Sequence, residues 1–272
     1  MNQESGRESP SNVGGLSPIS KVLGKAAARE KVEVICVDCG RPFNAIPWGP
    51  ITTRVCLVCS TVRQERRETL ERLAKEHAKE QRYLDLIRVA GVPPRWRDVR
   101  FGSLDPDIQP VAQKIARAYA EGFSKESPSL VLYSPGNGTG KTTLGYCIVN
   151  YLVHEMRVPV VARKARDVML ELRNTFSDRQ ETEAAVLNRV SYADLLFLDD
   201  VGKDPRSHWI YSTYWTLLDR RYDWQLPIVI TTNKPIEGRG EVLADRIGED
   251  AVSRLLGLCG NNVIDMTGVD LR

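Results

Sequence analysis

The residues best placed to do chemistry form one glycine-rich segment, Gly136-Asn137-Gly138-Thr139-Gly140-Lys141-Thr142-Thr143. This segment follows an apolar run, Leu130–Tyr133, and precedes a segment with helical periodicity. A strand, a glycine-rich turn and a helix N-terminus together surround phosphate oxygens with backbone N–H groups. We expect Lys141 to reach the β- and γ-phosphates of ATP, and the Thr142 hydroxyl to hold Mg²⁺.

The segment departs from the usual phosphate-loop pattern at one position. The pattern G-x-x-x-x-G-K-[ST] places a glycine five residues before Gly140, where this chain has Pro135, and Gly136 follows one residue later. A glycine-rich turn that binds nothing is the alternative interpretation. The flanking strand and helix favour the nucleotide site.

Two carboxylates follow another apolar run, Leu195–Leu198. Asp199, at the expected end of a buried strand, is suited to the Mg²⁺ shell. Asp200 is suited to orient and deprotonate the attacking water. The alternative is a strand end capped by acidic turn residues. An aspartate at position 200 has a shorter reach than glutamate, which favours slow hydrolysis.

An amide side chain, Asn233, follows a third apolar run, Ile228–Thr232. Beside the γ-phosphate, such a side chain would help to position the water. A simpler interpretation is a turn-forming asparagine ahead of Lys234-Pro235.

Four of the six cysteines form two close pairs, Cys36-x-x-Cys39 and Cys56-x-x-Cys59, with 16 residues between the pairs. This is the spacing of a four-thiolate zinc site. A module this small buries little core, so a metal would supply its folding energy. Four free cysteines are the alternative, and a redox motif lacks the expected strand–helix flanks. Cys147 and Cys259 stand alone in apolar surroundings and are expected to be core thiols.

Short apolar runs alternate with amphipathic segments after the break at Gly91-Val92-Pro93-Pro94. The expected strands are 130–133, 158–162, 195–198, 228–232 and, more weakly, 263–266. The expected helices are 107–123, 141–155, 164–176, 180–191, 207–222 and 240–256. This alternation predicts an α/β fold, a parallel sheet flanked by helices.

Composition and pattern suggest four regions. We expect a disordered tail over 1–30, a zinc-binding module over 31–60, a helical linker over 61–90 and an ATPase domain over 91–272. The 272 residues are 42% hydrophobic and carry a net charge of +3. That apolar fraction supports a buried core. The sequence has no run of about 18 apolar residues, so we expect no membrane span. We also expect no secretory leader, and therefore a cytoplasmic protein.

These residues, in this order, resemble the AAA+ ATPases of the DnaC/DnaI helicase-loader and IstB group. The resemblance covers about residues 91–272 and extends beyond the nucleotide motifs. It includes Val92-Pro93-Pro94-Arg95-Trp96 and Phe101, Leu218–Tyr222, Asp245-Arg246-Ile247 and Ser253-Arg254-Leu255. The last two segments resemble the part of the family that carries an arginine finger. The resemblance favours Arg254 as the finger and leaves Arg246 as the second candidate. A surface helix arginine is the alternative for either.

The resemblance implies an ATP-dependent loader of a replicative DNA helicase that hydrolyses ATP with Mg²⁺, engages single-stranded DNA and assembles as a homo-oligomer. The zinc module and its helix would bind the helicase. An IstB-like transposition helper is the first alternative. A nucleotide-switch adaptor with little hydrolysis is the second.

Overall fold

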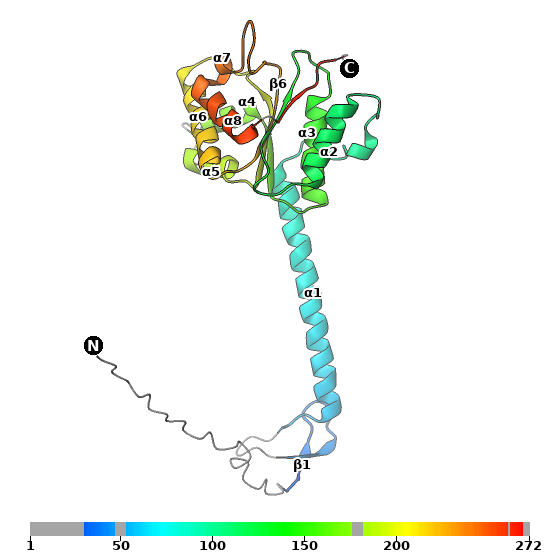
Figure 1. Ribbon diagram of the computed structural model, residues 1–272. Helices are drawn as coiled ribbons and strands as arrows, with labels where there is room; N and C mark the ends of the chain where they lie inside the picture. Colours follow the sequence, from blue (N-terminus) through cyan, green and yellow to red (C-terminus); the bar gives the residue numbers. More distant parts are fainter. Residues whose placement is uncertain (1–29, 47–52, 176–181, 261, 269–272) are drawn as a thin grey trace, which may run out of the picture. The chain divides into compact units, whose positions relative to one another are not determined.

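The computed structural model describes residues 30–46, 53–175, 182–260 and 262–268 (Figure 1). The expected N-terminal tail, apart from residue 30, lies outside these residues. So do the end of the helix expected over 164–176 and the start of the one expected over 180–191. The chain divides into two compact units, Met1–Glu76 and His77–Arg272, which are described separately.

The first unit contains a small hairpin and the beginning of a long helix. Strands β1 (Val32–Ile35) and β2 (Pro42–Ala45) pair antiparallel, with Val34 opposite Phe43. The pattern did not predict β2, because a proline usually argues against a strand. It is tolerated here as the first residue of an edge strand.

Helix α1 (Leu57–Ala90) has 34 residues and includes the boundary between the two units. It ends before Gly91, whose φ of 64° is a left-handed conformation that favours glycine. Within the described part of the chain, no helix is both long and apolar enough to cross a membrane.

The second unit is built on a parallel sheet in the order β4-β5-β6-β3-β7. Its strands are β3 (Leu130–Tyr133), β4 (Val160–Lys164), β5 (Leu195–Val201), β6 (Ile228–Thr232) and β7 (Val263–Asp265). The three central strands are almost continuously buried and rich in Val, Ile and Leu, as expected for a sheet covered on both faces. The predicted parallel sheet is confirmed.

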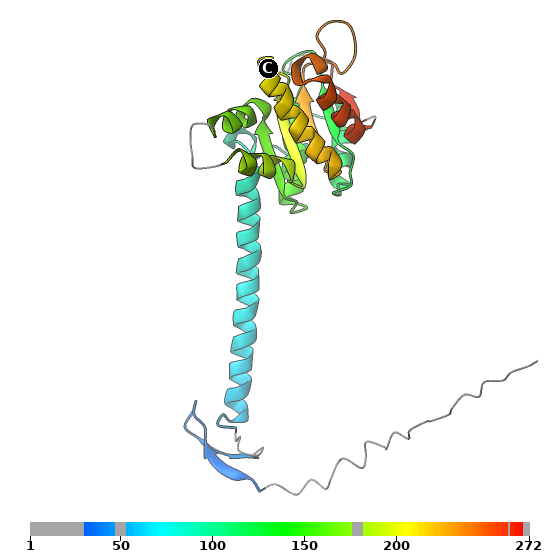
Figure 2. The ribbon, with the colours of Figure 1, turned by 90° about the vertical axis from the view of Figure 1, so that its left-hand side faces the viewer.

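Helices cover both faces of this sheet (Figures 1 and 2). One core contains residues of α4 (Ala165–Asn174), α5 (Glu183–Ser191), α6 (His208–Asp223), α7 (Ala244–Ile247) and α8 (Glu249–Cys259). The other contains residues of α2 (Pro110–Glu121) and α3 (Lys141–His154), together with Ala90 at the end of α1. The carboxyl ends of neighbouring parallel strands meet at one edge of the sheet, where a ligand site is expected.

One expected helix, 240–256, is wrong in its bounds. Two helices replace it, because Gly248 has φ 95° and ψ 146° and interrupts the helical backbone between α7 and α8. The helical periodicity also does not extend back to residue 240. Gly238 and Gly240 have φ of 138° and 93° in a loop, and α7 begins only at Ala244.

Candidate functional site

The glycine-rich segment forms a turn between β3 and α3, as its sequence predicts. Gly138 and Gly140 have φ of 74° and 88°, conformations that strongly favour glycine. Gly140 is the N-cap of α3, so the positive end of the helix dipole faces the turn. Gly136 does not have a positive φ, whereas the two glycines that the turn requires are both present.

The amine of Lys141 lies over the turn. Its Nζ donates hydrogen bonds to the backbone oxygen of Gly136 at 2.7 Å, to that of Ser134 at 3.3 Å and to Oγ1 of Thr139 at 3.4 Å. The residue is only 8% exposed, and its burial lowers the pKa of the amine. Phosphate oxygens could replace these neutral acceptors and would place a negative charge beside the buried ammonium.

The Asp199 side chain, on β5, forms hydrogen bonds to β6 and to the first turn of α3. Its Oδ1 accepts one hydrogen bond from Thr142 Oγ1 at 2.7 Å and another from Thr231 Oγ1 at 2.7 Å. Burial raises the pKa of this carboxyl, and the two hydroxyl donors oppose that shift. A hydroxyl and a carboxylate this close are hard oxygen donors of the kind that Mg²⁺ prefers, so the pair fits the ion.

The contribution of Thr231 is not evident from the sequence motifs. It lies on β6, and its hydroxyl also accepts a hydrogen bond from the backbone N–H of Asp200 at 2.8 Å. One side chain therefore fixes both carboxylate residues at the end of β5. The signal available in the sequence was a pair of threonines in an otherwise apolar, fully buried strand.

Asp200 has an unusual backbone. Its φ of 62° lies in the left-handed region, and the pairing of β5 with β6 is irregular between Leu198 and Val201. Such a conformation costs about 1–2 kcal/mol in a residue other than glycine. The Asp200 carboxylate forms an ion pair with Lys203 Nζ at 2.7 Å.

Asn233 directly follows β6, next to the end of β3. The Ser134 N–H donates a hydrogen bond of 3.2 Å to the backbone oxygen of Thr232, which joins the two segments. Asn233 Oδ1 is buried and has no hydrogen-bond partner among the described residues. The N–H of Lys234 bonds to Thr232 Oγ1 at 3.1 Å, so the backbone also turns here. The side chain thus has a free acceptor at the carboxyl end of β6, near the glycine-rich turn.

The two candidate arginine fingers lie in different surroundings. Arg254, on α8, donates from Nε to Asp219 Oδ1 at 2.7 Å and lies 4.9 Å from the ring centre of Tyr222. Its side chain is 40% exposed. Among the described residues, Arg254 makes no contact with Lys141 of the same chain. Arg254 therefore belongs to the surface of the α6–α8 pair.

Arg246 is instead held by its own chain. Its guanidinium donates to the backbone oxygens of Gly202 at 2.8 Å and Asp204 at 2.6 Å, and it pairs with Glu241 at 3.2 Å. Only 18% of its side chain is exposed. Three partners leave this guanidinium poorly available to a second subunit.

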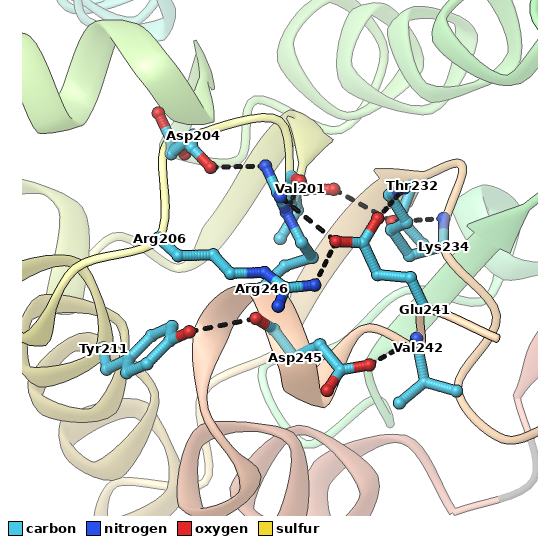
Figure 3. A network of polar contacts seen from close by, with 11 residues as sticks. Val201, Asp204, Arg206, Tyr211, Thr232, Lys234, Glu241, Val242, Asp245 and Arg246 are labelled. Atoms are coloured by element: carbon cyan, nitrogen blue, oxygen red, sulfur yellow. Dashed lines mark hydrogen bonds and ion pairs between the residues drawn. The ribbon is translucent and has the colours of Figure 1, made fainter.

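Glu241 is the centre of a charged cluster that sequence reasoning did not identify (Figure 3). Its carboxylate pairs with Lys234 and Arg206 as well as Arg246. Hydrogen bonds from Lys234 and Arg206 are the main reason that its pKa falls to about 2. The cluster connects the segment after β5 with the loop after β6. Lys234, Glu241 and Arg246 lie in one irregular loop and short helix without a periodic pattern, and Arg206 is 35 positions from Glu241.

A mainly apolar pocket adjoins the phosphate loop at Thr139, Gly140, Thr143 and Leu144, with a volume of about 120 Å³. Its other walls come from residues distant in sequence: Leu104, Asp105, Ile108, Gln109, Gln113 and Met266. A flat aromatic base could pack between such walls while its phosphates reach Lys141. Only the tertiary structure assembles this pocket.

The four paired cysteines come together in the first unit. Their sulfur atoms all lie within 4.8 Å of one another, and the Sγ atoms of Cys39 and Cys56 are 3.9 Å apart. Tetrahedral zinc thiolates have sulfurs separated by about 3.8 Å, given Zn–S bonds of about 2.3 Å. The arrangement of Cys36, Cys39, Cys56 and Cys59 therefore fits a zinc ion.

Local contacts support this cluster. The N–H of Cys56 donates to Cys36 Sγ at 3.3 Å, and this bond is the main reason that the pKa of Cys36 falls to about 6. Gly40, with φ of 69°, closes the first turn through a 2.9 Å bond from its N–H to the Cys36 oxygen. Arg63 of α1 pairs with Asp38. The unpaired thiols Cys147 and Cys259 are buried, as expected.

Known proteins share both sequence and fold with this chain. A family model of IstB-like ATP binding proteins matches residues 64–270. The replicative helicase loader DnaC of Escherichia coli (strain K12) is 28% identical over 160 residues, covering 58% of this chain and 64% of that protein. The phage-like element PBSX protein XkdC of Bacillus subtilis (strain 168) is 29% identical over 136 residues, covering 48% of each chain. This chain thus spans less than two thirds of the length of either relative.

Solved structures agree on the fold. The crystal structure of the DnaC helicase loader has a TM-score of 0.54 at 22% identity and covers 64% of this chain and 99% of that one. The crystal structure of DnaI has a TM-score of 0.52 at 18% identity and covers 67% and 95%. The expected resemblance and the expected AAA+ core are both confirmed. The chain belongs to the family of IstB-like ATP binding proteins.

Proposed function

We propose that this protein is an ATP-dependent loader of a replicative DNA helicase and that it acts in DNA replication. The observation that carries the ATPase part is the carboxylate of Asp199, shared by Thr142 and Thr231 beside the phosphate loop of Lys141. The relatives named as replicative helicase loaders support the loading part.

In the proposed reaction, the backbone of residues 136–143 and the Lys141 ammonium bind the triphosphate. Mg²⁺ would be held by Thr142 and Asp199, where it would neutralise charge that develops on the phosphate oxygens. Asp200 accepts a proton from the attacking water, and Asn233 orients that water with its free amide oxygen. The apolar pocket beside Thr143 receives the base.

Assembly would complete the site. We propose that Arg254 of one copy stabilises the transferring phosphoryl group in its neighbour, as an arginine finger supplied from a second subunit. Its exposure on α8 supports this role, and the three contacts of Arg246 within its own chain argue against the alternative. The protein would then act as a homo-oligomer.

The N-terminal part would recognise the helicase. We propose that zinc bound by Cys36, Cys39, Cys56 and Cys59 folds a module over residues 31–60, with a helical linker over 61–90 and an ATPase domain over 91–272. The sulfur positions support the metal. Engagement of single-stranded DNA by the oligomer and a cytoplasmic location belong to the same proposal.

A pull-down separates this proposal from its main rival. The purified full chain, with ATP and Mg²⁺, should retain the replicative helicase of its host. Retention of an IS21-type transposase instead would favour an IstB-like transposition helper, which the family match makes the second candidate. Tight ATP binding without turnover, in the presence of either partner, would favour a nucleotide-switch adaptor.

A further inference from the structure

A lysine outside the phosphate loop contacts the carboxylate that we propose as the general base. Lys203 Nζ lies 2.7 Å from Asp200 Oδ1, and the two side chains are 42% and 36% exposed. The two residues are separated by a tight turn through Gly202, whose φ is 88°. The ammonium thus occupies one acceptor site of a carboxylate that water would otherwise approach.

The backbone on each side of Lys203 is fixed. Arg246 donates to the oxygen of Gly202 at 2.8 Å and to that of Asp204 at 2.6 Å. The carboxylate of Asp204 accepts a 2.8 Å hydrogen bond from the buried hydroxyl of Tyr214. Residues 202 and 204 are therefore anchored, and the Lys203 side chain starts from a defined position near Asp200.

The same arginine is anchored in turn. Glu241 pairs with Arg246 and also with Lys234, which follows Asn233 (Figure 3). A chain of contacts therefore runs from the end of β6 through Glu241 and Arg246 to the turn that carries Lys203. These contacts link the segment that follows β6 to the segment that follows β5.

We propose that Lys203 is a positioning residue that restrains Asp200, and that the pair of Arg246 and Glu241 holds it in place. The inference rests on the proposed ATPase function. A hydrogen bond from Nζ occupies one acceptor site of Asp200 Oδ1 and holds the carboxylate toward Lys203, so the carboxylate is less free to take a proton from water. Because a half-exposed ion pair is weak, the restraint slows hydrolysis without preventing it.

The first test compares turnover in variants of the full chain. Lys203→Met should raise kcat for ATP hydrolysis about fivefold, equivalent to about 1 kcal/mol, while KM for ATP stays the same. Lys203→Arg, which keeps the charge, should give a smaller rise. The matched control is Lys125→Met, which breaks the ion pair of Lys125 with Asp194 at 2.9 Å and should leave kcat unchanged. Unchanged or lower kcat in Lys203→Met overturns the proposal.

The supporting residues give a second arm. Glu241→Gln should raise kcat in the same direction, because the anchored turn loosens. The double variant with Lys203→Met should show no further increase, since both changes act through one ion pair. Fully additive effects would overturn the assigned connection between Glu241 and Lys203.

A third test needs no turnover. In nucleotide-free protein, an amine-reactive acylating reagent should modify Lys203 faster in Asp200→Asn than in the wild type, with Lys125 as the internal reference. Equal labelling in the two proteins overturns the ion pair. If the wild type neither binds nor hydrolyses ATP, the proposed function fails, and the labelling result still reports on Lys203 and Asp200.

Discussion

The hydroxyl of Thr231 on β6 donates a 2.7 Å hydrogen bond to Asp199 on β5, and this bond crosses between two neighbouring strands at the phosphate edge of the sheet. The same hydroxyl accepts the N–H of Asp200. A residue outside the recognised motifs thus fixes the carboxylate of Asp199 and the backbone of Asp200.

Thr231→Val should therefore damage the site although valine has nearly the same shape. It removes the donor to Asp199 and leaves the N–H of Asp200 without its acceptor, at a cost of about 1–3 kcal/mol in unfolding free energy. We expect a lower midpoint of thermal unfolding and at least a tenfold loss of kcat (about 1.4 kcal/mol). Thr231→Ser keeps the hydroxyl and should retain most activity. Wild-type turnover in Thr231→Val would show that this bond does not position the carboxylates.

Lys141→Ala should weaken ATP binding severely, because it removes the buried ammonium that would pair with the phosphate oxygens. Fluorescent-nucleotide titration can measure this loss. Lys125→Ala, a change at a surface lysine, is the control and should bind ATP like the wild type. Normal ATP affinity in Lys141→Ala would remove the phosphate-loop assignment.

The purified protein should contain about one zinc ion per chain, held by four thiolates. Elemental analysis can measure the stoichiometry. Cys36→Ser or Cys59→Ser should lose the metal and unfold residues 31–60, while ATP binding by the ATPase domain survives. Cys147→Ala changes a buried thiol outside the cluster and should keep its zinc. A metal-free protein whose hairpin remains folded would contradict the zinc site.

Arg254→Ala should leave ATP binding by an isolated subunit intact and reduce kcat of the assembled protein by on the order of a thousandfold. Mixing it with Lys141→Ala provides the sharper measurement. One interface in such a mixed assembly joins an intact phosphate loop to an intact arginine, so partial recovery of ATPase activity is expected. Full activity of Arg254→Ala alone would exclude this arginine as the finger.

Local pattern was sufficient for the glycine-rich turn and for most strands and helices of the second unit, but not for β2 or for the break between α7 and α8. The strands 130–133 and 228–232 have the predicted bounds, because short runs rich in apolar and β-branched residues, bounded by turn residues, favour buried strands. Gly138 and Gly140 occupy conformations that their residue type predicts. The cysteine spacing likewise predicted the sulfur cluster, since a tight turn brings Cys36 close to Cys39 and the start of α1 brings Cys56 close to Cys59.

The sequence by itself thus determined the alternating strands and helices, the glycine-rich turn, the two carboxylates at the end of β5 and the two cysteine pairs, because each depends on residues close together in the chain. Only the tertiary structure decided that Thr231 connects Asp199 to Asp200, that Glu241 and Arg246 anchor the turn beside Lys203, and that Met266 closes the pocket next to Thr143. The physical reason is that parallel strands bring together side chains 30 or more positions apart, as Asp199 and Thr231 are, and no local periodicity records such a contact.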